Sequence, residues 1–199
     1  KAEAFAALQE GPDILVLPNC WDAGSAKILA DAGFPAIATT SAGVAFAHGY
    51  ADGHVISREE MCAEVARCAA IVGVPLTADM EAGYGAAPQD VAETIRQVIA
   101  AGAVGANIED AIATEAEPML DMSLAVGRIR AGREAADAAG IPFLIHARTD
   151  VCLYNKGATP AMFDEAVARA NAYYAAGARC AYVPGVADPD LIQRLTNAI

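Results

Sequence analysis

The sequence is poor in basic residues. It carries 13 lysines and arginines against 25 aspartates and glutamates, which gives a net charge of -12 at pH 7. A surface this acidic repels nucleic acid and anionic membranes, so we expect neither as a partner. An anionic substrate is still compatible with it, because a metal ion or an arginine can reverse the field inside a cleft.

Cysteine motifs and long apolar runs are missing as well. No Cys-x-x-Cys pair occurs, and the cysteines and histidines do not form a zinc spacing. We interpret the cysteines as reduced thiols and expect a cytoplasmic protein. No apolar run is long enough to span a membrane. The cysteines are Cys20, Cys62, Cys68, Cys152 and Cys180.

The residues that are present predict a folded domain. Of the 199 residues, 55% are hydrophobic and 19% are charged, a composition that argues against disorder. A chain of this length can bury a sizeable core and is usually one domain. We therefore expect a single α/β domain over residues 1–199.

Short apolar runs alternate with longer helical patterns along the chain. Each run has the length of a strand and is bounded by Gly, Pro or Asn. The predicted strands are Asp13–Pro18, Ala36–Thr40, Leu76–Glu81, Gly105–Glu109, Phe143–Arg148 and Arg179–Pro184. The predicted helices are Asp22–Ala32, one that begins at Ser57, Pro88–Ala101, Ser123–Ala139 and Thr159–Ala176.

This alternation predicts a parallel sheet with helices outside it, either a doubly wound open sheet or an eight-stranded barrel. A dinucleotide fingerprint is absent, because the run Gly83-Tyr84-Gly85 has Pro88 where the third glycine would stand. Polar residues stand instead at the carboxyl ends of successive strands, as in a barrel. We predict a (β/α)8 TIM-type barrel. Only six strands are recognised, so either two are undetected or the chain stops before the last two.

The polar strand ends could form one site. Side chains two apart on a strand share a face, so Asp79 lies with Glu81, and His146 with Arg148. Glu109, on the strand between, shares its face with Asn107. Three carboxylates this close would repel one another, and a divalent cation resolves the repulsion. Oxygen ligands without a His/Cys set favour Mg²⁺, or alternatively Mn²⁺.

These strand ends could also bind substrate. For each polar residue among them, a purely structural role is the alternative. Arg148 can hold a carboxylate or phosphonate with two parallel hydrogen bonds. Strand-end acids often cap a helix or pair with a base, and Asp110 could pair with a neighbouring helix. His146 could equally be a core histidine.

Four motifs resemble a known family. They are LPNCWDAGSAKILADAGFPAIATTSAGVA, ADMEAGYG, NIEDA and HARTD, in this order along nearly the whole chain. They are similar to motifs of the isocitrate lyase/phosphoenolpyruvate mutase superfamily, in its phosphonomutase-like branch. The resemblance implies an (α/β)8 barrel, a homotetramer with a swapped eighth helix, and a small carboxylate or phosphonate substrate. It also implies that the domain over residues 1–199 is incomplete at its C-terminal end, where the last strands would follow.

The resemblance also implies roles for individual residues. Asp79 corresponds to the direct metal ligand, and Glu81 and Glu109 to ligands that act largely through water. Arg148 corresponds to the substrate-binding arginine, and Asp52 to an aspartate near the reacting centre. The loop that holds substrate oxygens in the family corresponds to Thr40, Ser41, Ala42, Gly43 and Val44. His146 is a further candidate for substrate binding.

One loop departs from the family. After Glu109-Asp110 the lyases carry a Lys-Lys-Arg-Cys-Gly-His run whose cysteine is the catalytic acid/base. This chain has Ala111–Pro118 instead, without a cysteine, so the catalytic acid is not carried over from the lyases. The loop also has Glu115 and Glu117 near the places where the mutases have a lysine and an Asn-Ser pair, and acidic side chains disfavour a phosphoryl group.

Three hypotheses for function follow. The first is a Mg²⁺-dependent lyase that cleaves a C–C bond of a small 2-oxo or 2-hydroxy carboxylate through a metal-stabilised enolate. The second is phosphonomutase-type chemistry at a P–C bond. The third is a binding protein that retains the metal and carboxylate pocket without turnover.

Overall fold

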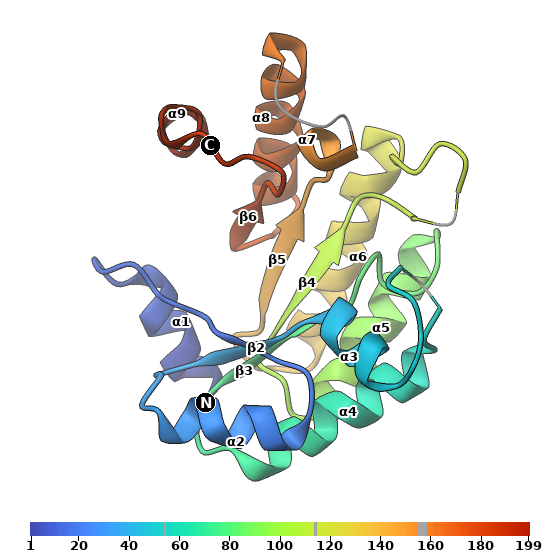
Figure 1. Cartoon of the computed structure of the whole chain (residues 1–199). Coiled ribbons are helices and arrows are strands. Elements are labelled where there is room, and N and C mark those ends of the chain that lie inside the picture. The colour runs from blue at the N-terminus through green and yellow to red at the C-terminus, as the bar shows by residue number, and fades with distance from the viewer. Residues whose placement is uncertain (54, 114, 155–158) are drawn as a thin grey trace.

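The computed structural model describes residues 1–53, 55–113, 115–154 and 159–199. In these ranges the strands form one parallel sheet whose spatial order follows the chain, from β1 to β6 (Figure 1). Sequential order with parallel neighbours is what successive right-handed βα units produce, and it excludes the doubly wound sheet, whose order reverses. The strands are β1 Asn19–Cys20, β2 Ile37–Thr39, β3 Leu76–Asp79, β4 Gly105–Glu109, β5 Leu144–Arg148 and β6 Cys180–Tyr182.

Helices cover the outer face of the curved sheet (Figure 1). None of the described helices is long and apolar enough to cross a membrane. The helices are α1 Ala2–Glu10, α2 Ala23–Asp31, α3 Ser41–Ala47, α4 Arg58–Ile71, α5 Pro88–Ala100, α6 Met122–Ala138, α7 Val151–Tyr154, α8 Pro160–Ala175 and α9 Pro189–Ala198.

Local sequence signals fix several helix ends. Ser57 and Glu60 form the predicted capping box at the start of α4. The helices α2, α5, α6 and α8 are each followed within two residues by a glycine with positive φ, which satisfies the helix end without a Cβ clash. These glycines are Gly33, Gly102, Gly140 and Gly177.

The main core lies between the sheet and the outer helices, as expected for strands that carry helices on one face. A smaller core closes the amino-terminal end of the sheet, where Phe5 of α1 packs against Val104 and Leu144. The carboxyl ends of the strands are left free at the opposite end, which is where polar side chains gather.

The first predicted strand was wrong. Asp13–Pro18 is irregular, and Ile14 is 93% exposed, while sheet pairing begins one residue later with Asn19 opposite Ala38. The proline has no N–H to donate to a ladder, although its carbonyl still accepts a hydrogen bond from the Ala38 amide (3.0 Å).

Other boundaries also differ. The predicted strand Leu76–Glu81 ends at Asp79. The predicted loop around Ser41 is the helix α3, capped by Thr40, and α1, α7 and α9 were not predicted. Short helices have weak sequence signals, because tertiary packing rather than propensity stabilises them.

Gly105 tests how tightly the amino-terminal end of the sheet is packed. A Cβ at this position would lie 2.8 Å from Thr77 Oγ1 and 3.0 Å from both the Leu144 carbonyl and Phe5. We expect Gly105→Ala to lower the free energy of unfolding by about 1–3 kcal/mol, measured by urea denaturation. Gly73→Ala is the control, because nothing lies within 4 Å of its added Cβ. Equal effects of the two substitutions would contradict this packing.

Candidate metal and substrate site

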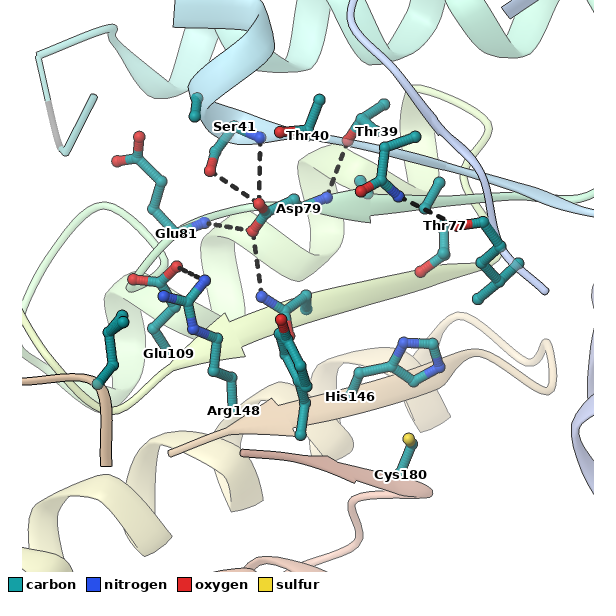
Figure 2. A pocket seen from close by; sticks show the side chains of 18 of the residues that line it. Thr39, Thr40, Ser41, Thr77, Asp79, Glu81, Glu109, His146, Arg148 and Cys180 are labelled. Carbon is teal, nitrogen blue, oxygen red and sulfur yellow. Dashed lines mark hydrogen bonds and ion pairs between the residues drawn. The ribbon is translucent and has the colours of Figure 1, made fainter. Parts of the chain in front are cut away.

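A cavity of about 650 Å³ opens at the carboxyl ends of the strands. Polar side chains from β2, β3, β4 and β5 line it, and Figure 2 shows them facing a common space. The predicted site residues Asp52, Asp79, Glu81, Glu109, His146 and Arg148 all line this cavity, as do Thr40, Ser41 and Ala42.

Asp79, the last residue of β3, is held by hydrogen bonds from three neighbouring segments (Figure 2). Its Oδ2 accepts from the Ser41 amide (3.1 Å) and hydroxyl (2.7 Å), and its Oδ1 from Asn107 Nδ2 (3.1 Å). The Thr39 hydroxyl accepts a hydrogen bond from the Asp79 amide (2.9 Å). The hydrogen bonds to both carboxylate oxygens therefore fix the orientation of the Asp79 side chain.

The helix α3 brings Ser41 to this position. Thr40 caps the helix by accepting from the Gly43 amide (3.4 Å), and a Cβ on Gly43 would lie 2.6 Å from Thr40 Cγ2. The glycine thus permits the tight turn that aims the first residue of α3 at Asp79. The loop that the resemblance implied is a helix start, and its residues Thr40, Ser41 and Ala42 reach the cavity.

Glu81 is presented by a strained turn. Because β3 ends at Asp79 and Glu81 has a φ of +49°, the period-two argument that put both carboxylates on one face does not apply. Figure 2 shows the Glu81 carboxyl group turned away from that of Glu109, although Glu81 is buried and lines the cavity. Tyr84 also has positive φ (+59°), and such non-glycine conformations each cost about 1–3 kcal/mol.

Glu109 and Arg148 form an ion pair across β4 and β5. Their register places them opposite each other, and Arg148 Nη1 lies 2.7 Å from Glu109 Oε1. Arg148 Nε also donates to Asp150 Oδ1 (2.6 Å). Burial raises the pKa of Glu109 to about 9, since the loss of solvation and the nearby Asp79 and Asp150 outweigh the attraction of Arg148.

His146 lies deeper in the cavity than Arg148. Its ring packs near Phe5, with the ring centroids 5.8 Å apart, and the residue is only 8% exposed. Burial lowers the pKa of His146 to about 4, so the ring is neutral at physiological pH. Among the described residues its Nε2 has no hydrogen-bond partner. This geometry is compatible with both a core histidine and a polar group at the floor of the site.

Asp52 lies at the rim. It is exposed, and its neighbour Gly53 faces the next loop, where a Cβ on Gly53 would lie 3.1 Å from Ala113 Cβ. The loop that departs from the family is closed at its base by a bridge between Ala111 and Met119 and by a hydrogen bond from the Ile112 amide to the Pro118 carbonyl (2.8 Å). Thr114 of this loop lies outside the described residues.

Asp110 pairs with a neighbouring helix, so the structural alternative for this residue is confirmed. Its Oδ2 accepts from Arg169 Nη1 (3.1 Å) and the Tyr173 hydroxyl (2.6 Å), both on α8. Its Oδ1 accepts from the Asp150 amide (2.9 Å). Asp110 thereby supports Asp150, which in turn orients Arg148.

Sequence reasoning missed Arg128, a buried arginine of α6. It donates to the Glu109 carbonyl (3.1 Å), the Gly85 carbonyl (3.1 Å) and the Ala82 carbonyl. One signal was available: Arg128 stands at helical spacing with the buried residues Ala125, Ile129 and Gly132. A cation on such a face needs buried partners.

The donor set fits a hard divalent cation. Asp79, Glu81 and Glu109 offer carboxylate oxygens. Burial is the main cause of the raised pKa of Glu109, and the neighbouring acidic groups add to it, so a bound cation would favour its ionised form. Within the described ranges, no three acidic, histidine or cysteine side chains are arranged to hold an ion directly. Arg148 draws Glu109 to itself, and Glu81 turns away. Any ion here would therefore be held by few direct protein contacts and by water.

The pKa of Glu109 predicts how stability changes with pH. The folded-state pKa is raised above 4.5, so the free energy of unfolding falls as pH rises from about 4.5 towards 9. In EDTA we expect the wild type to lose up to about 1.4 kcal/mol per pH unit more than Glu109→Gln between about pH 7 and 9. His146 does not contribute in this window, because its lowered pKa removes stability only as pH falls below about 6.5. The free energies come from urea denaturation at each pH. If they change with pH equally in the wild type and in Glu109→Gln, the raised pKa of Glu109 is contradicted.

Several known proteins are similar to this chain. Residues 5–199 match the family described as phosphoenolpyruvate phosphomutase. The 2-methylisocitrate lyase of Escherichia coli K12 is 30% identical over 207 residues, which cover 100% of this chain and 66% of the lyase. The chain spans about two thirds of the length of the curated relatives it matches first (66% in each case).

Solved structures share the fold. A Burkholderia cenocepacia J2315 protein provisionally named a phosphonomutase is 44% identical with a TM-score of 0.95, and the match covers 100% of this chain and 80% of that one. Oxaloacetate acetylhydrolase, solved with its product oxalate, is 27% identical with a TM-score of 0.90, over 100% of this chain and 68% of that one.

Proposed function

The chain belongs to the phosphoenolpyruvate phosphomutase family, and on that premise we propose that it is a Mg²⁺-dependent lyase that cleaves a C–C bond of a small 2-oxo or 2-hydroxy carboxylate. Membership confirms the resemblance carried by the four sequence motifs, and the TIM-type barrel fold with it. The superfamily contains lyases and phosphonomutases of small carboxylates.

The observation that carries the proposal is the meeting of Asp79, Glu109 and Arg148 on one cavity wall. Arg148 Nη1 lies 2.7 Å from Glu109 Oε1, and Asp79 ends β3, the strand next to β4. Carboxyl oxygens beside a guanidinium suit a substrate that has both a metal-chelating end and a carboxylate end.

In this proposal Asp79 holds the ion directly, and Glu81 and Glu109 hold it through water. When bound, the ion would stabilise negative charge that develops on the substrate oxygens during cleavage. The Ser41 amide and hydroxyl, which already donate to Asp79, hold that carboxylate in place at the wall of the cavity.

Arg148 binds the substrate carboxylate in this proposal. In the free protein its guanidinium is shared between Glu109 and Asp150. Once Glu109 turns to other partners, Nη1 can donate to an incoming carboxylate while Asp150 still holds Nε. Asp150 thus keeps the guanidinium plane fixed through the exchange.

Proton transfer has one candidate group in this proposal. Asp52 lies on the rim of the cavity, where a carboxyl group could reach a substrate that fills it. The loop from Ala111 to Pro118 has no cysteine, so the acid of the isocitrate-cleaving lyases is not available from this segment. We propose Asp52 as the group near the reacting centre.

A second candidate function is phosphonate chemistry at a P–C bond. The 44% identity to the Burkholderia protein favours it. The acidic Glu115 and Glu117 in the loop beside the cavity count against it, because they would repel a phosphonate dianion. Binding without turnover is the remaining alternative.

We also propose a homo-oligomer, as the family resemblance implies. The exposed apolar side chains of Ile14, Val16 and Ile28 are compatible with buried contacts between copies. Analytical ultracentrifugation tests this proposal, and a monomer at all protein concentrations would exclude the homo-oligomer.

Oxalate tests the metal and carboxylate site directly, because it imitates an enolate of pyruvate. We expect calorimetry to detect oxalate binding with Mg²⁺ and none with EDTA, and Asp79→Asn to weaken binding by about a hundredfold. The control is Glu64→Gln, a buried carboxylate outside the cavity that contacts Arg67 (2.6 Å). Metal-independent binding, or equal losses in both variants, would contradict the proposal.

Turnover separates the candidate functions. We expect release of a cleaved 2-oxo acid from at least one dicarboxylate with Mg²⁺, and a drop of about tenfold or more in kcat/KM for Arg148→Lys, which keeps the charge but loses the planar pair of donors. If phosphorus NMR detects turnover of a phosphonate and no dicarboxylate is cleaved, the second candidate, P–C bond chemistry, is favoured. Oxalate binding without any turnover would favour the third.

A further inference from the structure

Arg128 is buried in an unusual way for a cation. It is 1% exposed, and its described hydrogen bonds all go to backbone carbonyl oxygens. A buried guanidinium needs partners for its donors. Both terminal nitrogens of Arg128 have them, while its Nε has none among the described residues. The identity of these carbonyls therefore indicates what the side chain does.

The carbonyls belong to the two segments that present Glu81 and Glu109. Nη1 donates to the carbonyl of Glu109 itself, at the end of β4. Nη2 donates to the carbonyls of Ala82 and Gly85, in the turn that follows β3. One planar group thus spans two strand ends that carry acidic residues of the cavity.

The turn from Glu81 to Gly85 needs such support. With Glu81 and Tyr84 at positive φ, the backbone leaves the sheet ladder and its carbonyls require other donors. The Glu109 amide serves the Glu81 carbonyl (2.9 Å), Thr94 the Gly83 carbonyl (2.8 Å) and Arg58 the Tyr84 carbonyl (2.9 Å). Arg128 also donates to this turn, and unlike Thr94 and Arg58 it is described with a second hydrogen bond to β4, at the Glu109 carbonyl.

We propose that Arg128 is a positioning residue that sets the placement of Glu81 relative to Glu109, and through it the affinity of the site for a metal-bound carboxylate ligand. This inference rests on the proposed function. A positioning role can be told apart from a purely electrostatic role. If Arg128 acted only through its charge, removing that charge near the carboxylates would tighten cation binding. If Arg128 positions the carboxylates, removing its donors weakens the binding of the cation and its ligand instead.

Two variants and one control test the proposal. Arg128→Met removes the donors and the charge, and Arg128→Lys keeps the charge but cannot span both strand ends. Arg133→Met is the matched control, because Arg133 lies on the same helix and donates to the Phe143 carbonyl (2.7 Å), ahead of β5 and away from the cavity. Each is compared for Mg²⁺-dependent oxalate binding by calorimetry, at temperatures where circular dichroism shows it folded.

We expect Arg128→Met to weaken oxalate binding at least about tenfold, Arg128→Lys by an intermediate factor and Arg133→Met by less than about twofold. Unchanged or tighter binding in Arg128→Met, or an equal loss in Arg133→Met, would overturn the inference. If Arg128→Met does not fold, Arg128→Lys decides, and wild-type affinity in that variant overturns it.

Hydrogen exchange gives a readout that does not depend on metal. In EDTA, the amides from Glu81 to Gly85 and at Glu109 should exchange faster in Arg128→Met than in Arg133→Met. Equal exchange at these amides would also overturn the inference. If wild-type protein fails to bind oxalate while this local difference persists, the proposed function fails and the support of the turn by Arg128 stands.

Discussion

The crowding of acidic side chains at one end of the sheet is the constraint on which the rest of the site depends. Asp79 and Glu109 end adjacent parallel strands, and the pairing of Asp79 with Asn107 and of Glu109 with Arg148 fixes their neighbours. Buried carboxylates are tolerated only where donors or cations face them. Ser41 of α3, Asn107 of β4 and Arg148 of β5 supply these partners.

Support for these partners comes from outside the sheet. Asp110 is tied to α8 by Arg169 and Tyr173, and it holds the Asp150 amide. Asp150 then orients Arg148. Buried ionic groups add little net stability compared with apolar packing, while breaking one is strongly destabilising. Such a chain of contacts is better explained by the geometry it imposes on Arg148 than by stability.

Much of the fold could be predicted from the sequence because its signals are local. Alternating apolar runs and helical patterns predicted β2 to β6 and the helices α2, α4, α5, α6 and α8, and the capping box at Ser57 and the glycines after the helices fixed several ends. The first predicted strand was wrong because the run Asp13–Pro18 has the composition of a strand, whereas sheet pairing begins only at Asn19, and local composition does not encode where pairing begins. The helix α3 failed because its seven residues have little helical pattern of their own.

The sequence by itself determined which residue types stand at the strand ends, and hence that acidic, amide and guanidinium groups meet at one end of a parallel sheet. That follows from the period of a strand and the parallel order of βα units, which are local rules. Only the tertiary structure decided that Glu81 turns away from Glu109, that Arg148 is shared between Glu109 and Asp150, and that Arg128 supports the turn from behind. These depend on backbone angles beyond the end of β3 and on contacts between residues far apart in the chain, such as Arg128 and Ala82, which no local pattern encodes.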